Sequence, residues 1–180
     1  ATAVTRTWLN RAQDTKCVLD WIPVSEVAAI RNYTSTTDLT LYINRAIAAV
    51  AANPGGRLWF PAGLYPIAST IGQSDLRNII ICGDGGRDLS YLANSGTVIK
   101  FTGTGSGSIM NLRENRAVVI EHIQFVYTSS SFTGTCFDCA TVINSGNGSM
   151  FNWVQFYSPA GLLTASRVWY LRNCVDITFD

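Results

Sequence analysis

The acidic side chains are the residues of this sequence that could perform acid–base chemistry. Cleavage of a glycosidic bond needs two carboxyl groups about 5 to 10 Å apart, one as proton donor and one as base or nucleophile. Six acids stand on or beside segments that read as strands: Asp84, Asp88, Glu114, Glu121, Asp138 and Asp176. None forms a catalytic motif, and solvated charges that keep sheet edges from pairing are the favoured interpretation. The sequence therefore leaves the catalytic residues unknown.

Lyase chemistry finds little more support. It would need a lysine or arginine to stabilise an enolate-like intermediate, often together with calcium. The chain has only two lysines, Lys16 and Lys100, and no acidic cluster typical of a calcium site. Its single histidine, His122, follows Glu121 directly. Adjacent residues of a strand point to opposite faces, so these two are not expected to form a dyad.

The five cysteines read as thiols rather than as a disulfide framework or a metal site. An odd number at scattered positions argues against disulfides in a chain of 180 residues. Cys136 and Cys139 form one C-x-x-C pair, whereas structural zinc needs four ligands. The glycines at 83–86 are not followed by the helix that a phosphate-binding loop requires. We therefore predict buried thiols, no metal and no cofactor.

Aromatic residues are the remaining candidates for ligand contact, because sugar rings stack on exposed aromatic faces. The aromatic residues considered are Trp59, Tyr65, Trp153, Tyr157, Trp169 and Tyr170. Burial in a core or in a subunit interface is the commoner fate of such side chains. The possible glycan or interface contacts selected from the whole sequence are Glu121, Trp153, Tyr157 and Trp169.

Composition excludes several classes of protein. Hydrophobic residues make up 47% of the chain and charged residues only 14%, which suits stacked strands better than helical bundles with solvated faces. A net charge of +1 gives no basic field to attract nucleic acid. No apolar run approaches the roughly 20 residues that span a bilayer, and no signal peptide pattern opens the chain. We expect a protein that binds neither nucleic acid nor membrane and is not exported by the Sec route.

The segment from Thr36 to Ser69 organises the chain. Its first part predicts a helix whose apolar residues share one face: Leu39, Ile43, Ala46, Ile47 and Val50. Thr36, Thr37 or Asp38 can supply the N-cap, and the Asn-Pro-Gly-Gly at 53–56 ends the helix. Two extended runs follow, at 57–60 and 65–68, joined by a turn at 61–63.

Similar strand-like runs then recur along the chain. Further strands are predicted at 76–82, 97–101 and 109–112. The run at 116–125 is echoed at 149–156, with Ile120 matching Phe151, Ile123 matching Val154 and Phe125 matching Phe156. Residues 172–179 show a similar pattern, and residues 77–82 are an earlier copy of it. Such recurrence is typical of a solenoid, whose first turn needs a cap with a polar outer face. Leu39, Ile43, Ile47 and Val50 are predicted to form that capping helix.

The N-terminal segment is harder to interpret. Residues 1–20 are compatible with one helical stretch, with Val4, Trp8 and Ala12 on one side, or with an arm ordered only by its context. Residues 24–30 can make one or two helical turns before a polar loop.

The helix, the run GGRLWFPAGLYPIAST at 55–70 and the run IIICGDGGR at 79–87 together resemble the start of the pectate-lyase-like right-handed parallel β-helix family. Many phage tailspikes and capsule depolymerases begin in this way. Members often carry an Asp-Gly-x-x-Asp-Asp run before the helix, of which this chain keeps only Asp38. The resemblance covers roughly residues 22–101. It implies a mainly β, right-handed single-stranded parallel β-helix with a short N-terminal α-helix as its cap, and a homotrimer.

The resulting expectation is a lead segment at 1–35, followed by a capping helix and the first turns of a β-helix at 36–180 that continues in a longer protein. The preferred function is the N-terminal portion of a phage tailspike or receptor-binding protein in the virion tail, assembled in the host cytoplasm. Its partners would be other tail proteins and host surface polysaccharide, which the whole protein could also degrade. The alternatives are a non-enzymatic virion adaptor and a truncated cellular polysaccharide lyase or hydrolase.

Overall fold

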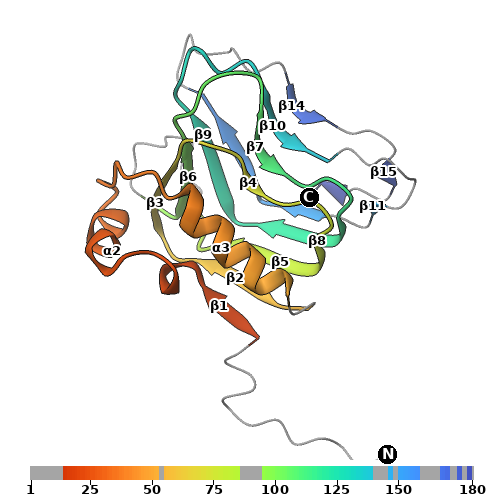
Figure 1. Cartoon of the computed structure of the whole chain (residues 1–180), viewed down its shortest axis with the longest axis horizontal. Helices are drawn as coiled ribbons and strands as arrows, with labels where there is room; N and C mark the ends of the chain where they lie inside the picture. The colour runs from red at the N-terminus through yellow and green to blue at the C-terminus, as the bar shows by residue number, and fades with distance from the viewer. Residues whose placement is uncertain are drawn as a thin grey trace, which may run out of the picture.

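The strands of this protein pair only in parallel over the residues described by the computed structural model. Those residues are 14–52, 55–85, 95–139, 146–147, 150–158, 167–170, 174–175 and 178–179. The strands form three sheets (Figure 1). The protein is therefore mainly β, as its composition and strand-like runs predict, and its sheets are parallel, as the family resemblance implies.

Each sheet collects strands from successive parts of the chain. The first sheet has the order β1 (Thr15–Cys17), β2 (Arg57–Phe60), β5 (Arg77–Gly83), β8 (Arg116–Glu121), β11 (Gly146–Asn147) and β15 (Cys174–Val175). Beside β8 also lies β12 (Met150–Asn152), which pairs with β16 (Thr178–Phe179). The second sheet contains β3 (Gly63–Ile67), β6 (Thr97–Phe101), β9 (Ile123–Tyr127) and β13 (Gln155–Tyr157). The third contains β4 (Ile71–Gly72), β7 (Ser108–Asn111), β10 (Thr135–Asp138) and β14 (Arg167–Tyr170).

The chain visits the three sheets in rotation. β2, β3 and β4 are followed by β5, β6 and β7, then by β8, β9 and β10 and by β12, β13 and β14. Parallel neighbours cannot be joined by a tight hairpin, so the chain passes through the other two sheets before it returns. The predicted repeats lie side by side, as the pairing of Ile120 with Phe151 and of Phe125 with Phe156 shows. Val154, predicted to match Ile123, lies between β12 and β13.

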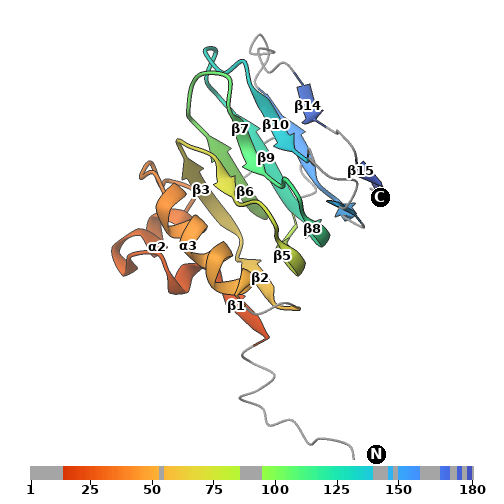
Figure 2. The ribbon, with the colours of Figure 1, turned by 45° about the vertical axis from the view of Figure 1, so that its right-hand side comes forward.

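Two helices lie at the end of the sheets formed by the early strands (Figure 2). α3 (Thr40–Ala51) packs on β2, β4, β5 and the short 3-10 helix at Val18–Asp20, and α2 (Val24–Arg31) packs on β3. The α3 stripe of Leu39, Ile43, Ile47 and Val50 is at most 1% exposed. Figure 2 shows β14 and β15 at the far end of the sheets from α3. This is the place that a cap would occupy, although capping itself stays a prediction.

The helical interpretation of residues 1–20 is wrong for its last part. Thr15–Cys17 form β1, which pairs in parallel with Arg57–Trp59 of β2, and a 3-10 helix follows at Val18–Asp20. A three-residue strand has no periodicity of its own and forms because β2 offers it an edge. Val4, Trp8 and Ala12 lie outside the described residues.

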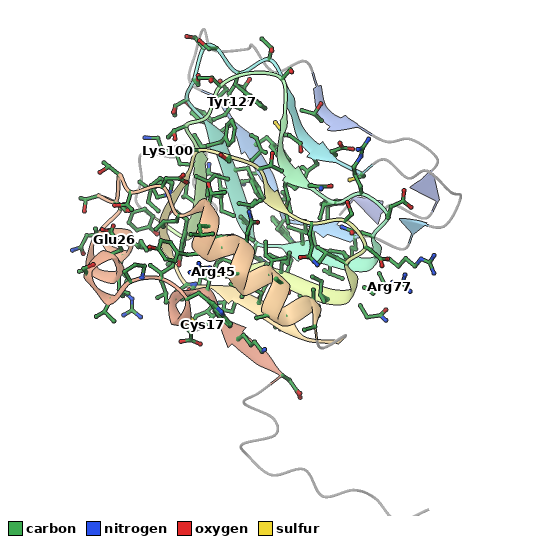
Figure 3. The ribbon with its side chains drawn as sticks, viewed as in Figure 1. Cys17, Glu26, Arg45, Arg77, Lys100 and Tyr127 are labelled. Atoms are coloured by element: carbon green, nitrogen blue, oxygen red, sulfur yellow. The ribbon has the colours of Figure 1, made fainter. Side chains whose placement is uncertain are left out.

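The core lies between the sheets and under α3. Figure 3 shows side chains filling this space, while Arg77 points away from the body of the molecule. The interior column of the first sheet is Leu58, Ile81, Ile120 and Phe151, which are paired in register and at most 3% exposed. Phe125, Phe137, Phe151 and Phe156 form an aromatic cluster with centroid separations of 4.9 to 5.7 Å. Stacked parallel strands thus bring like residues of successive turns into contact.

Asp38 ties the start of α3 to the end of β3. Its Oδ1 accepts hydrogen bonds from the Thr40 amide (3.0 Å), the Thr40 hydroxyl (2.5 Å) and the Ala68 amide (3.0 Å). Burial disfavours the ionised carboxyl, but the hydrogen bonds from Thr40 and Ala68 together outweigh this effect and hold the pKa of Asp38 below its ordinary value. The sequence predicts the N-cap at Thr36, Thr37 or Asp38, but the N-cap position is Leu39. Asp38 lies one residue before it, and its carboxylate accepts from the first helical amide.

We expect Asp38→Ala to lower the free energy of unfolding by about 1–2 kcal/mol at pH 7, a loss comparable with that of an N-cap side chain. A lowered native pKa adds stability above the unfolded pKa of about 3.9, and this stability is lost as pH falls through the native value. The difference between the native protein and Asp38→Asn, which keeps an Oδ1 acceptor, should therefore shrink between about pH 5 and pH 3. Urea unfolding at several pH values measures it; a constant difference would contradict the role of the charge.

Candidate functional site

A surface corner between the first and second sheets carries the best candidate site. Here the chain turns from β8 into β9 at His122 and from β12 toward β13 at Trp153. Both residues have positive φ, 59° and 53°, and they occupy equivalent positions because Glu121 pairs with Asn152. The left-handed backbone is disfavoured for residues with a Cβ. Its recurrence at two equivalent positions indicates that this corner is a repeated feature of the fold.

The layer before this corner has a glycine at the equivalent position. Gly83 follows Cys82, which pairs with Glu121, so Gly83 matches His122. A Cβ at Gly83 would overlap the His122 carbonyl oxygen and the Thr97 side chain. The neighbouring Gly85 donates to the His122 carbonyl (3.1 Å) and accepts from the Thr97 amide (2.9 Å). Close backbone contact therefore fixes the corner where these segments meet.

This corner holds a groove with a volume of about 500 Å³. We call it the corner groove, and its described lining residues are Asp84, Gly85, Ser95, Gly96, His122, Trp153 and Gln155. Trp153 is 54% exposed, which is unusual for so large an apolar side chain. Aromatic surface beside a few polar groups is the usual character of a small-molecule or sugar site.

Asp84 anchors one wall of the corner groove. Its Oδ1 accepts a hydrogen bond from the Trp59 indole (2.6 Å), and its Oδ2 accepts one from the Ala62 amide (2.8 Å). The Asp84 amide in turn donates to the Thr97 hydroxyl (2.9 Å). The carboxylate is held between β2 and the turn into β3, which makes it a fixed acceptor and positions Trp59 beside the groove.

Gln155 contributes an acceptor that the protein does not satisfy. Its Oε1 is shielded from solvent and has no hydrogen-bond partner. A buried polar atom without a partner is costly and calls for an explanation. Gln155 lines the corner groove, and a donor on a bound ligand would satisfy this oxygen once the side chain turned toward the groove.

Glu121 is on the outer face of the first sheet, one residue before the corner. Arg57 donates from its terminal guanidinium nitrogen to Glu121 (2.6 Å) and from Nε to the Cys82 sulfur (2.9 Å). Burial raises the pKa of the Cys82 thiol, although the Arg57 hydrogen bond opposes this. Glu121 is therefore engaged in an ion pair, and neither it nor Asp84 stands as an unengaged acid beside the groove.

The other predicted contacts lie elsewhere. Tyr157 is at the far end of β13, opposite Val126, and is half-buried. Trp169 lies on β14 opposite the buried Phe137, and its side chain is outside the described residues. Tyr65, considered for sugar stacking, is fully buried and donates to the Pro61 carbonyl (2.8 Å), so that interpretation is wrong. The structure thus brings Glu121 and Trp153 to neighbouring positions and leaves the other two apart.

Sequence reasoning missed Asp84, His122 and Gln155 as parts of one site. The segment 116–125 reads as a single strand, whereas the chain turns at His122 into a different sheet. His122 is thus not a strand residue, so the argument that placed it on the face opposite Glu121 does not apply. The signal lay in the repeats, since the register that pairs Cys82, Glu121 and Asn152 also aligns the residues that follow them.

A second, more polar groove of about 450 Å³ lies along the third sheet. We call it the third-sheet groove, and its described lining residues are Thr70, Ser106, Gly107, Ser108, Asn111, Arg113, Thr135 and Asp138. Arg113 forms an ion pair with Asp138 across it (3.3 Å). No aromatic side chain is among these described lining residues, so it is the weaker candidate for sugar binding.

The described cysteines are free thiols. Cys136 and Cys139 are at most 5% exposed, and burial raises the pKa of Cys136 to about 12. Over the described residues, no three or more histidine, cysteine, aspartate or glutamate side chains gather as metal ligands would. No helix within the described part of the chain has the length and apolar character to cross a membrane.

Comparisons with known proteins give a likeness to a solved structure. No family model and no curated protein matches the chain. The structure is similar to ORF18 of Geobacillus virus E2, with a TM-score of 0.54 and 20% sequence identity. The alignment covers 79% of this chain and 25% of that protein, so this chain spans about a quarter of its length. At this identity the likeness shows a shared fold.

Proposed function

We propose that this chain is the N-terminal portion of a phage virion protein of the tailspike type, which attaches to host surface polysaccharide through the corner groove. The fold likeness to a much longer phage protein supports a phage-related role. The rotation of the chain through three parallel sheets supports a right-handed parallel β-helix as the body of the molecule. A virion tail location and a homotrimer belong to the same proposal.

The observation that carries polysaccharide binding is the exposed Trp153 beside polar groups in the corner groove. The apolar face of an indole packs against the C–H groups of a sugar ring, while hydroxyls need fixed hydrogen-bonding partners. Asp84 and Gln155 supply acceptors, and the Ser95 hydroxyl and His122 imidazole supply groups that donate or accept.

Binding is better supported than cleavage. Hydrolysis needs two carboxyl groups with separate acid and base roles. Asp84 is hydrogen-bonded through both oxygens, and Glu121 is paired with Arg57. We therefore expect this chain to bind glycan without cleaving it; release of reducing ends from capsular or O-antigen polysaccharide would overturn that expectation.

Trp153→Ala is expected to weaken glycan binding at least tenfold, because it removes the stacking surface of the corner groove. Titration calorimetry or affinity electrophoresis of the native chain against a panel of bacterial surface polysaccharides measures the effect. Met150→Ala is the matched control: Met150 lies on β12, three residues before Trp153, and is 40% exposed, but it does not line the groove. Equal losses in both variants would contradict the assigned site.

A non-enzymatic virion adaptor is the second candidate, and one surface favours it. The outer face of the first sheet carries an apolar column of Ile80, Val119 and Met150, in register and partly exposed. Such a column suits a subunit contact. Mass in solution by light scattering separates a trimer from a monomer, and a trimer without affinity for any glycan would favour the adaptor.

A further inference from the structure

We infer that the corner groove selects uncharged, hydroxyl-rich glycan and discriminates against acidic polysaccharides such as those built from uronic acids. This inference rests on the proposed function and adds the class of ligand. It depends on the charge of the groove wall and on whether the polar groups of that wall donate or accept hydrogen bonds.

The charge of the groove wall is the first reason. Asp84 is an acidic lining residue, and no lysine or arginine is among the described residues that line the groove. A sugar carboxylate would have to lose water beside the Asp84 carboxylate, and none of the described lining residues carries a compensating positive charge of the lysine or arginine type. Like charges in a partly dehydrated site repel strongly, whereas an uncharged hydroxyl is attracted to the same carboxylate.

Two arginines of the described structure already have acidic partners. Arg57 is close by on the outer face of the first sheet, but it is paired with Glu121 and Cys82. Arg113 is in the third-sheet groove and is paired with Asp138. Neutralising an acidic sugar in the corner groove with Arg57 would break its pair with Glu121 and leave that carboxylate without its partner.

The second reason is that Asp84 and Gln155 contribute hydrogen-bond acceptors to the groove wall. Asp84 presents carboxylate oxygens, and the Gln155 Oε1 is an acceptor without a partner. An ionised carboxylate on a ligand accepts hydrogen bonds and donates none, so it cannot satisfy Gln155. Sugar hydroxyls and acetamido N–H groups donate, and they match this wall of acceptors.

The test compares neutral with acidic glycans on the native chain. The probes are dextran, mannan and galactan as neutral polymers, and polygalacturonate, alginate and hyaluronate as acidic ones, in affinity electrophoresis at physiological salt. We expect the best neutral polymer to bind at least tenfold more tightly than the best acidic polymer. That binding should be lost in Trp153→Ala.

A variant that adds a positive charge to the corner groove tests whether charge causes the preference. Gln155→Lys should raise affinity for acidic polymers at least tenfold and lower it for the neutral ones, because it places a cation in the groove. Thr135→Lys adds the same charge to the third-sheet groove and should change neither class.

The outcomes separate the two proposals. Tighter binding of acidic polymers, lost in Trp153→Ala, would overturn the neutral preference and leave polysaccharide attachment standing. Binding to no polymer of either class would overturn the proposed function and the preference with it. An unchanged acidic affinity in Gln155→Lys, with circular dichroism showing a native fold, would contradict the charge argument.

Discussion

The double substitution Ile43→Asp and Ile47→Asp is expected to unfold the protein or drive it to aggregate. Both side chains lie on the buried face of α3 and are at most 1% exposed. Loss of each isoleucine from a packed core costs about 2–5 kcal/mol. Burial of a carboxylate without a partner adds to this. The total is comparable with the whole stability of an ordinary domain, about 5–15 kcal/mol.

Thermal melting followed by circular dichroism, with sedimentation for aggregates, measures this effect. Leu41→Asp is the matched control, because Leu41 belongs to the same helix and is 56% exposed. It should change the free energy of unfolding by no more than about 0.5 kcal/mol. A double variant that melts like the native protein would contradict the role of α3 as a cap packed on β2, β4 and β5.

The parts of the fold that could be predicted from sequence are those with a local pattern. The helix at Thr40–Ala51 follows from its apolar stripe, and the strands at Arg57–Phe60 and Thr97–Phe101 follow from short apolar runs between turn residues. The repeats also predicted which strands lie together, as the pairing of Ile120 with Phe151 shows. Local pattern and long-range pairing agree here because like residues of successive turns pack on one another.

The parts that could not be predicted are those formed by distant partners. Thr15–Cys17 is a strand only because β2 lies beside it. His122 reads as a strand residue, but its positive φ turns the chain from the first sheet into the second. The corner groove requires both facts, since residues 84, 122, 153 and 155 meet only when the turns of three layers are superimposed. Asp84 and His122 were considered in sequence as separate residues, and Trp153 was the one lining residue selected there as a possible ligand contact.

Phe137 occupies the centre of the aromatic cluster. It is fully buried and its ring lies 4.9 Å from Phe125, 5.4 Å from Phe151 and 4.9 Å from Phe156, in edge-to-face arrangements. These partners come from β9, β12 and β13, so one ring on β10 joins strands of all three sheets. Phe137→Ala should lower the free energy of unfolding by about 3–5 kcal/mol through the cavity that it leaves.

Urea unfolding gives this value, and two further variants locate its cause. Phe137→Leu keeps much of the volume and should lose clearly less stability than Phe137→Ala. Met150→Ala removes a side chain that is 40% exposed on the outer face and should change stability by about 1 kcal/mol or less. If Phe137→Ala matched Met150→Ala, the sheets would not depend on a shared aromatic core. A loss confined to Phe137 would instead show that the stability of the three sheets depends on this shared aromatic core.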